Sequence, residues 1–392
     1  MASIGKVENS NNKIRSVNFR LIIAVLISSV IGVLVVHSAT ANEVTNSVVS
    51  TTVKQIIGVA GGIVIMVILM LIDYHKLVKY SFLFYIFAIG FLVYLLVFTQ
   101  PISGAKRWIY FRGFGTIQPS EFAKPALLMF MAFFVHKFED RISHVLSVLI
   151  FIACAAPILA LVLSEPDLST AIVIIVTLIS VLFLSGISYK WVLGVILAIL
   201  PFIIVFIIAV YQPGQGILHA LLKPHQVERI NGYFFPDDFP NVVYQQRNSV
   251  MAIGSGGFFG KGLNNSSLES VKNGSFLSEE QCDFIFAVIG EELGFVGAFA
   301  VIALIGVITF ECFRIARQCT DTVGKVIAGT SGSILFVQSF INIGVATLVL
   351  PNTGIPLPFF SAGLSSLLSS FILIGLVLSV GIHGRLKRRV YY

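Results

Sequence analysis

Apolar residues run along this chain in long stretches that short polar segments separate. A membrane-spanning α-helix needs about 20 consecutive apolar residues, because it must cross a hydrocarbon layer about 30 Å thick. The pattern therefore predicts an all-α, polytopic membrane protein in which a single integral membrane domain occupies residues 1–392. Ten transmembrane helices are predicted, at residues 19–38, 54–72, 79–98, 122–136, 145–163, 168–186, 190–211, 284–310, 326–350 and 357–382.

The positions of Lys and Arg predict how these helices are oriented, because basic residues are retained on the cytoplasmic side of a membrane. If the N-terminus lies inside, most of the 26 Lys and Arg residues fall on the cytoplasmic side, while segments 39–53, 164–168 and 349–357 carry none. We therefore expect a cytoplasmic tail at 1–18 and a basic cytoplasmic tail at 383–392. Anionic lipid head groups and inner loops account for the net charge of +7, so no nucleic acid partner is needed.

Two further features limit the classes of protein. No small-residue cleavage site stands out after the first apolar run, so we expect an uncleaved first span. The four cysteines lie far apart without a C-x-x-C spacing, which argues against a disulfide framework or a zinc site.

Two outer segments, 99–121 and 212–283, are too long to be simple connections. The second is predicted to be a large extracytoplasmic loop between helices 7 and 8, and function usually sits on such excursions. The first carries Lys106, Arg107 and Trp108 on the outer side, against the general charge bias. These residues either anchor the chain at the lipid interface or, for Lys106 and Arg107, bind a phosphate or diphosphate.

The segment after this loop, QPSEFAKP, brings charge into the fourth predicted helix. Pro119 and Ser120 resemble a helix start, and Glu121 and Lys124 lie three residues apart on one face. Charges entering a membrane helix must pair or line a wet cavity, so both an ion pair at the helix end and a polar cavity are open. Pro125 removes the hydrogen bond to the Glu121 carbonyl.

The next outer turn, SEPDLSTA, adds two more carboxylates, Glu165 and Asp167. Both favour a polar cavity near the outer face. Asp167 directly precedes an apolar helix, so for this residue a capping role is the simpler interpretation.

A glycine-rich stretch, YQQRNSVMAIGSGGFFGKGL, lies within the second long loop at 244–263. It does not match a phosphate-binding loop, because Ser255 replaces the first glycine and Gly262 replaces the final Ser or Thr. We therefore expect no nucleotide. The glycines instead indicate a tightly turning segment beside the membrane.

The segment SEEQCDFIFAVIGEELGF, at 278–295, concentrates five of the nineteen acidic residues. If the eighth helix begins at residue 284, Asp283 lies at its outer end on the same side as Gly290 and Gly294. A carboxylate there could accept a proton from a substrate hydroxyl. Glu291 and Glu292 lie deeper, and for them we expect structural pairing with cations such as Lys124.

Six motifs in order resemble those of the SEDS family, which comprises RodA, FtsW and SpoVE. They are GAKRWI, QPSEFAK, EPDLSTA, YQQRNSVMAIGSGGFFGKG, DFIFAVIGEELGF and PNTGIPLPFFSAGLSS, and together they span almost the whole chain. The resemblance implies a peptidoglycan glycosyltransferase of ten transmembrane helices in the bacterial cytoplasmic membrane. Such an enzyme polymerises lipid II on the extracytoplasmic side and works with a class B penicillin-binding protein, a transpeptidase. The Gly-Lys-Gly ending of the glycine-rich motif favours a RodA-like member.

The resemblance also assigns roles to residues. It implies that Asp283 is the catalytic base and that Glu121, Lys124 and Asp167 line the central cavity, with the basic motif of the first outer loop being Lys106, Arg107 and Trp108. The reaction releases undecaprenyl diphosphate, for which Lys106, Arg107 and Arg247 are suitable cationic partners, with or without a divalent cation such as Mg²⁺ or Mn²⁺.

Three departures from the family pattern stand out: Glu165 and Ser169 where members have Gln and Gly, Cys282 where they have Thr, and Ala362 within the last motif. Two other functions fit a chain of this kind. A flippase or transporter would also carry charges inside the membrane, but it needs polar groups accessible from both faces, and here the charged motifs lie towards one. A non-catalytic division scaffold would not need Asp283.

Overall fold

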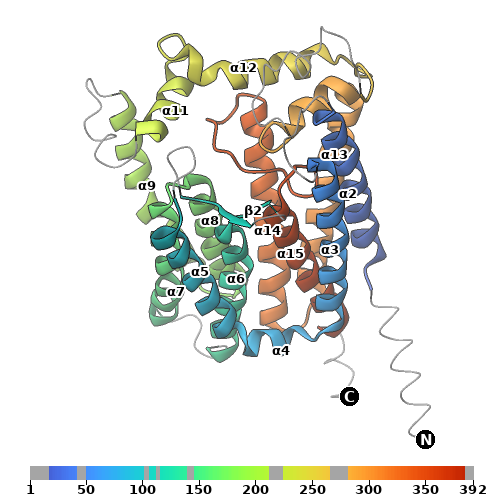
Figure 1. Ribbon diagram of the computed structural model, residues 1–392. Coiled ribbons are helices and arrows are strands. Elements are labelled where there is room, and N and C mark those ends of the chain that lie inside the picture. The colour runs from blue at the N-terminus through green and yellow to red at the C-terminus, as the bar shows by residue number, and fades with distance from the viewer. Residues whose placement is uncertain are drawn as a thin grey trace, which may run out of the picture.

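The computed structural model describes residues 17–41, 50–100, 106–111, 115–138, 145–211, 224–264 and 281–384. Within these residues the chain is a bundle of α-helices with one small β-hairpin (Figure 1). The long helices of the bundle are α2 (Phe19–Ala39), α3 (Thr51–Leu71), α5 (Ser81–Phe98), α6 (Pro119–Lys137), α7 (Val145–Ser164), α8 (Leu168–Leu184), α9 (Tyr189–Tyr211), α13 (Ile285–Gln318), α14 (Thr322–Ala346) and α15 (Leu364–His383).

A helix therefore overlaps each of the ten predicted ranges, with end points that differ by several residues. By length and composition, seven of the described helices could cross a membrane: α2, α3, α5, α7, α13, α14 and α15. Helix α8 is apolar but shorter, and α6 carries the charged pair Glu121 and Lys124 in its first turns. The protein is thus an integral membrane protein, and the count of ten crossings remains a prediction.

The bundle has two distinct ends (Figure 1). The outer end, as we call it, holds the start of α6 and α13 and carries the helices α11 (Pro224–Phe234) and α12 (Pro240–Ser255), which lie across it. The opposite, inner end holds the short helix α4 (Tyr74–Lys79). The described chain enters α2 and leaves α15 at the inner end, as an even number of crossings requires.

The loop predicted at 212–283 is partly helical rather than irregular, since α11 and α12 occupy its middle. Residues 212–223 and 265–280 lie outside the described part of the chain. Helix α11 forms because one of its sides is apolar: Val227 and Ile230 are buried against Ala209 and Val210 at the end of α9. This contact places the polar side of α11 at the outer end of the bundle.

The first long outer segment contains a β-hairpin that the apolar pattern did not predict. Strand β1 (Ile109–Phe111) pairs antiparallel with β2 (Gly115–Ile117), with Ile109 opposite Ile117. Helix α6 follows at once and begins at Pro119, which suits a first turn because proline has no N–H to leave unpaired.

Pro125 has the predicted effect inside α6. Its ring nitrogen cannot donate to the Glu121 carbonyl, and that carbonyl instead accepts a hydrogen bond from the Ser369 hydroxyl of α15 at 2.8 Å. The two helices are therefore joined where the α6 ladder is interrupted.

Helix α13 is broken at Gly294, whose φ of 66° and ψ of −162° are not helical. The glycine-rich segment after α12 packs against this break. Its Gly257 carbonyl accepts from the Phe295 N–H at 2.9 Å, and its Lys261 N–H donates to the Glu291 carbonyl at 3.0 Å. A side chain at Gly260 would collide with the Glu292 carbonyl, so the backbones approach this closely only because the residue is glycine.

Helices α14 and α15 form the centre of the bundle, and α15 packs closely on α3. Glycines allow that contact: Gly62 of α3 lies against the Phe371 ring, and Gly375 of α15 lies against the Met66 backbone. The core of the bundle is thus built around α14 and α15.

At the inner end, His75 of α4 lies between two carboxylates. Its Nδ1 is 2.7 Å from Asp73 Oδ1 and its Nε2 is 3.3 Å from Asp321 Oδ2. Asp321, the N-cap of α14, also accepts from the Tyr74 hydroxyl at 2.6 Å and from the Cys319 thiol at 3.0 Å. The hydrogen bond from Asp321 raises the pKa of His75, and burial only partly opposes it.

Candidate functional site

Asp283 lies in the turn that leads into α13, at the outer end of the bundle. The side-chain amide of Asn342, on α14, donates to the Asp283 carbonyl at 2.9 Å and to the Ile355 carbonyl at 2.7 Å. One buried amide therefore holds two segments together, the turn of Asp283 and the segment between α14 and α15. Asp283 is half-buried.

Gly354 lies next to the Asp283 carboxylate. Its φ of +74° falls in the left-handed region that favours glycine, and a Cβ placed there would lie 3.3 Å from Asp283 Oδ2. A side chain at this position would therefore crowd the Asp283 carboxylate.

The segment 350–363 is fastened by hydrogen bonds to its backbone. Ser169 of α8 donates to the Thr353 carbonyl at 2.6 Å, and the Ala362 N–H donates to the Gln281 carbonyl at 2.8 Å. Ser361 accepts from the Leu357 N–H at 2.7 Å. Two departures from the family pattern, Ser169 and Ala362, thus lie at the contacts that hold this segment beside Asp283.

Asp167 is the N-cap of α8, as its place in the sequence predicted. It accepts from the Thr170 N–H at 3.1 Å and from the Thr170 hydroxyl at 2.9 Å. It also accepts from the side-chain amide of Gln118 at 3.0 Å, which ties the start of α8 to the start of α6.

Arg107 and Glu165 meet at the turn between α7 and α8. Arg107 donates to the backbone carbonyls of Glu165, at 3.3 Å, and of Pro166. The Glu165 side chain has no exposed surface, and among the described residues neither of its carboxyl oxygens has a hydrogen-bond partner. Burial and the neighbouring Asp167 raise the pKa of Glu165 to about 9, although Arg107 opposes them.

Arg229, on α11, completes this group of charges. Burial and the charge of Arg107 lower the pKa of Arg229, while the carboxylates of Asp283 and Asp167 oppose the shift. The guanidinium therefore lies in the field of both carboxylates. We call Arg107, Glu165, Asp167, Arg229 and Asp283 the outer charge cluster.

The sequence analysis did not single out Arg229, because nothing in its neighbours marks it. The useful signal is the apolar side of α11, which fixes the helix against α9 and directs its polar side to the outer end. Gln226, one turn earlier, supports this placement by donating to the Pro166 carbonyl at 3.0 Å.

Three predicted cationic or aromatic residues make other contacts. The Lys106 amine donates to the Leu96 carbonyl at 2.7 Å, near the end of α5. Trp108 is half-buried immediately before β1. Arg247 lies on the exposed side of α12, 3.4 Å from the exposed carboxylate of Asp237. Arg229, in contrast, is half-buried.

Glu121 and Lys124 form the ion pair that their spacing allowed, with 2.6 Å between Lys124 Nζ and Glu121 Oε2. Both side chains are buried, so the pair offsets a large desolvation cost, and removing one partner would leave an uncompensated charge. The pair lies one turn from Gln118 and therefore just below the outer charge cluster.

Glu291 pairs with a cation, as predicted, and Glu292 accepts a hydrogen bond from a hydroxyl group, but the prediction of Lys124 as the cation was wrong. Glu291 lies 2.8 Å from Lys261 of the glycine-rich segment, and Glu292 accepts from the Ser38 hydroxyl of α2 at 2.5 Å. Lys124 is instead engaged by Glu121, one turn before it on the same helix, and Lys261 reaches Glu291 because the glycines bring its backbone onto α13.

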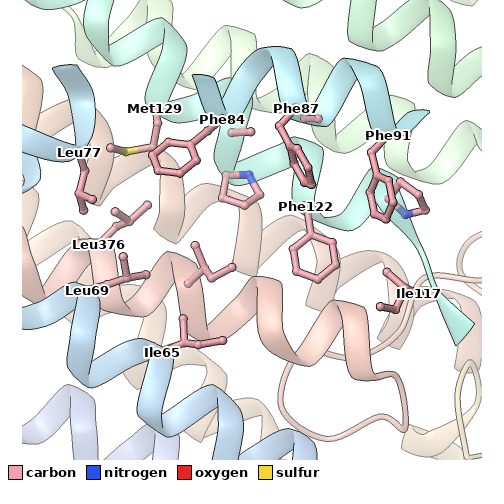
Figure 2. Close-up of a pocket in the computed structure, with 15 residues that line it drawn as sticks. Ile65, Leu69, Leu77, Phe84, Phe87, Phe91, Ile117, Phe122, Met129 and Leu376 are labelled. Carbon is pink, nitrogen blue, oxygen red and sulfur yellow. The ribbon is translucent and has the colours of Figure 1, made fainter. Parts of the chain in front are cut away.

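An apolar groove of about 460 Å³ runs between α3, α5, α6 and α15 (Figure 2). Phe84, Phe87 and Phe91 of α5 form one wall, and Ile65 and Leu69 of α3 lie across from them. At its outer end the groove is lined by Ile117 and Pro119, the two neighbours of Gln118, which itself contacts Asp167. The groove therefore ends close to the outer charge cluster.

The described residues contain no group of three or more His, Cys, Asp and Glu side chains arranged to hold a metal ion. The divalent cation, Mg²⁺ or Mn²⁺, stays a prediction.

A family model described as a cell cycle protein, for FtsW, RodA and SpoVE, matches residues 19–386. The chain belongs to the FtsW/RodA/SpoVE family. This confirms the SEDS membership that the motifs predicted, and with it the assignment to a family of peptidoglycan-synthesis enzymes.

The names of curated relatives agree with this family assignment. A probable peptidoglycan glycosyltransferase FtsW from Trichlorobacter lovleyi is 32% identical over 83% of this chain and 82% of its own length. Stage V sporulation protein E from Bacillus subtilis is 31% identical over 93% of this chain and 97% of its own.

Solved structures share the fold. A chain from a structure titled as a peptidoglycan synthase complex coordinating polymerization and crosslinking aligns with a TM-score of 0.74 at 24% identity, over 96% of this chain and 98% of that chain. Thermus thermophilus RodA aligns with a TM-score of 0.65 at 24% identity, over 96% and 98%. Because relatives from several branches match, the RodA-like assignment stays a prediction.

Proposed function

We propose that this protein is a peptidoglycan glycosyltransferase that polymerises lipid II at the outer face of the bacterial cytoplasmic membrane. The observation that carries the proposal is the placement of Asp283, a half-buried carboxylate beside Gly354, within a cluster that also holds Arg107 and Arg229. The glycan strands made in this way would serve cell shape, division or sporulation, the roles found in this family. Both termini lie in the cytoplasm in this arrangement.

In the proposed reaction the 4-hydroxyl oxygen of the acceptor sugar attacks the anomeric carbon of the lipid-linked donor. The new oxygen–carbon bond forms while the bond from that carbon to the diphosphate breaks, which inverts the anomeric configuration. Asp283 accepts the hydroxyl proton as general base, and undecaprenyl diphosphate leaves with the electron pair of the broken bond. General-base help of this kind accelerates reactions typically by about 10²–10⁴.

The basic residues of the cluster suit the leaving group. Arg229 and Arg107 supply positive charge near Asp283, and guanidinium groups bind phosphate oxygens in pairs of hydrogen bonds. Lys106 and Arg247 are weaker candidates, because their contacts direct them to the end of α5 and to Asp237.

The apolar groove suits the lipid part of the substrate. It is lined almost entirely by Phe, Leu, Ile, Pro and Met side chains, and its outer end lies beside Gln118 and Asp167. An isoprenoid chain in the groove would thus place its diphosphate near the outer charge cluster. We therefore assign the groove to the lipid-linked substrate or to a membrane lipid.

We propose a class B penicillin-binding protein as the partner that crosslinks the new glycan. Support comes from the structure titled as a peptidoglycan synthase complex, with which this chain shares its fold. Helices α11 and α12 form a surface at the outer end that projects beyond the bundle (Figure 1).

The test is to incubate the purified protein and its transpeptidase partner with labelled lipid II and to separate the glycan products. The wild type is expected to form long glycan, and Asp283→Asn is expected to lower the rate at least about 100-fold while the thermal midpoint stays unchanged. Glu228→Gln, at an exposed carboxylate of α11, is the matched control and should retain the wild-type rate.

The other candidate functions predict different results. A flippase would move labelled lipid II between the leaflets of a vesicle without making glycan, and a scaffold would do neither. Glycan formed equally well by Asp283→Asn would exclude the proposed base.

A further inference from the structure

Two members of the outer charge cluster, Glu165 and Asp167, have no part in the reaction above, and of these Asp167 has a structural role as the N-cap of α8. Glu165 lies in the turn between α7 and α8 with no exposed surface, and neither carboxyl oxygen has a hydrogen-bond partner among the described residues. Leaving a buried polar group without a partner is unfavourable, so a protein rarely keeps one that has no use.

Glutamine has nearly the same shape as glutamate but cannot ionise. Compared with a glutamine of the same size, Glu165 therefore adds a proton-dependent charge to the site.

The charged groups around Glu165 come from three elements. Asp167 follows it in the same turn, Arg107 precedes β1, and Arg229 on α11 lies in the fields of Arg107 and Asp167. Arg107 bonds to the Glu165 backbone carbonyl rather than to its carboxyl group. Asp167, the cap of α8, accepts three hydrogen bonds, and a second carboxylate charge beside it is unfavourable.

A carboxyl group in these surroundings stays protonated at neutral pH, in agreement with the raised pKa of about 9. The neutral acid adds no negative charge to the site, so the positive charge of Arg107 and Arg229 is not compensated by it. The ionised form would instead add negative charge where a diphosphate is proposed to bind.

We propose that Glu165, as a neutral carboxylic acid, leaves the outer charge cluster positive enough to hold the diphosphate of the lipid-linked substrate, and that its ionisation at alkaline pH weakens substrate binding. The inference rests on the proposed function for the identity of the substrate. Because Glu165 has no exposed surface, it acts on the bound anion through its charge, beside Arg107 and Arg229, and not by contact.

The first test compares the wild type with Glu165→Gln in the lipid II assay as the pH is raised. For the wild type, KM is expected to rise about tenfold per pH unit once the carboxyl group ionises, while kcat changes little. For Glu165→Gln, which has no ionisable group at this position, KM should show no such rise. Glu228→Gln, the exposed control, should behave as the wild type. The same rise of KM in Glu165→Gln as in the wild type would overturn the proposal.

A second test reads the protonation state without activity. The infrared spectrum of the wild type at neutral pH should contain a carbonyl stretch of a protonated carboxyl group that disappears in Glu165→Gln and on alkaline titration. Absence of such a band would overturn the proposal. The affinity of each protein for undecaprenyl diphosphate can also be measured directly. This affinity should fall as the pH is raised for the wild type but not for Glu165→Gln.

Protein stability gives a third, independent readout. The folded carboxyl holds its proton up to a pH of about 9, whereas the unfolded one releases it near 4.5, so the wild type loses stability relative to Glu165→Gln between these values. The thermal midpoint of the variant should therefore exceed that of the wild type by a difference that grows from pH 5 to pH 9. If neither protein forms glycan, the proposed function fails, while infrared and diphosphate binding still decide the role of Glu165.

Discussion

The two ends of the bundle both concentrate charge, but they treat it differently. At the inner end, His75 contacts both Asp73 and Asp321, and Asp321 also accepts from Tyr74 and Cys319. At the outer end, the carboxyl group of Glu165 has no hydrogen-bond partner among the described residues, and Arg229 lies between groups of both signs. Mutual pairing indicates a cluster that stabilises the fold, whereas incomplete pairing is typical of a site that receives a ligand.

Among the variants that test this comparison, Arg229→Ala is expected to have the largest effect on the rate of glycan formation. Arg229→Ala should lower the rate of glycan formation at least about tenfold, because it removes a cation from the field of Asp283 and from the proposed diphosphate site. The acid limb of the pH–rate profile should also move to higher pH, since an ionised carboxylate is disfavoured once a neighbouring cation is gone.

The matched control is Arg247→Ala on the adjacent helix α12. Arg247 contacts only an exposed aspartate in the described contacts, so its loss should change the rate by less than about twofold. Equal losses in the two variants would contradict the assignment of Arg229 to the site. Initial rates with labelled lipid II, measured across pH, provide the comparison.

A smaller effect is expected from Gly354→Ala. An alanine in this left-handed conformation costs about 1–2 kcal/mol, and its Cβ would lie 3.3 Å from Asp283 Oδ2, so both the thermal midpoint and the rate should fall. Gly90→Ala on α5 is the control, because no atom lies within 4 Å of a Cβ at that position. A Gly354→Ala protein with wild-type rate would show that the space beside Asp283 is not used.

The smallest effect concerns the inner end and should change stability alone. Because the pKa of His75 is raised in the folded protein, its protonated form stabilises the fold fully below pH 6.5, and this contribution is lost as pH rises through the raised value. His75→Gln should remove that pH dependence at a cost of about 1 kcal/mol and leave the rate of glycan formation per folded molecule unchanged. Thermal midpoints across pH, with rates measured on the same samples, test both points.

Several features of the site were predictable from spacing. Glu121 and Lys124 pair because they lie one turn apart, Asp167 caps α8 because it directly precedes an apolar helix, and α6 starts at Pro119. The seven described helices that are long and apolar enough to cross a membrane follow from the apolar runs. Each of these is a local property, which depends on residues within a few positions of one another.

Other features depend on contacts between distant segments, and the sequence pattern did not reveal them. The partner of Glu291 is Lys261, thirty positions away, and it reaches Glu291 only because a glycine-rich segment packs on the break in α13. Arg229 joins the outer charge cluster because α11 packs on α9, and Asn342 holds Asp283 because α14 lies beside α13.

The sequence by itself determined the class of this protein, its helices and the motifs that place it in its family. Helix formation and membrane insertion require only runs of suitable residues, so a one-dimensional pattern is sufficient. The tertiary structure decided which charges meet, that Glu165 is buried beside Asp167 and Arg107, and that the groove ends beside them. These properties depend on distance and on exclusion of water, and both are set only when separate helices pack together.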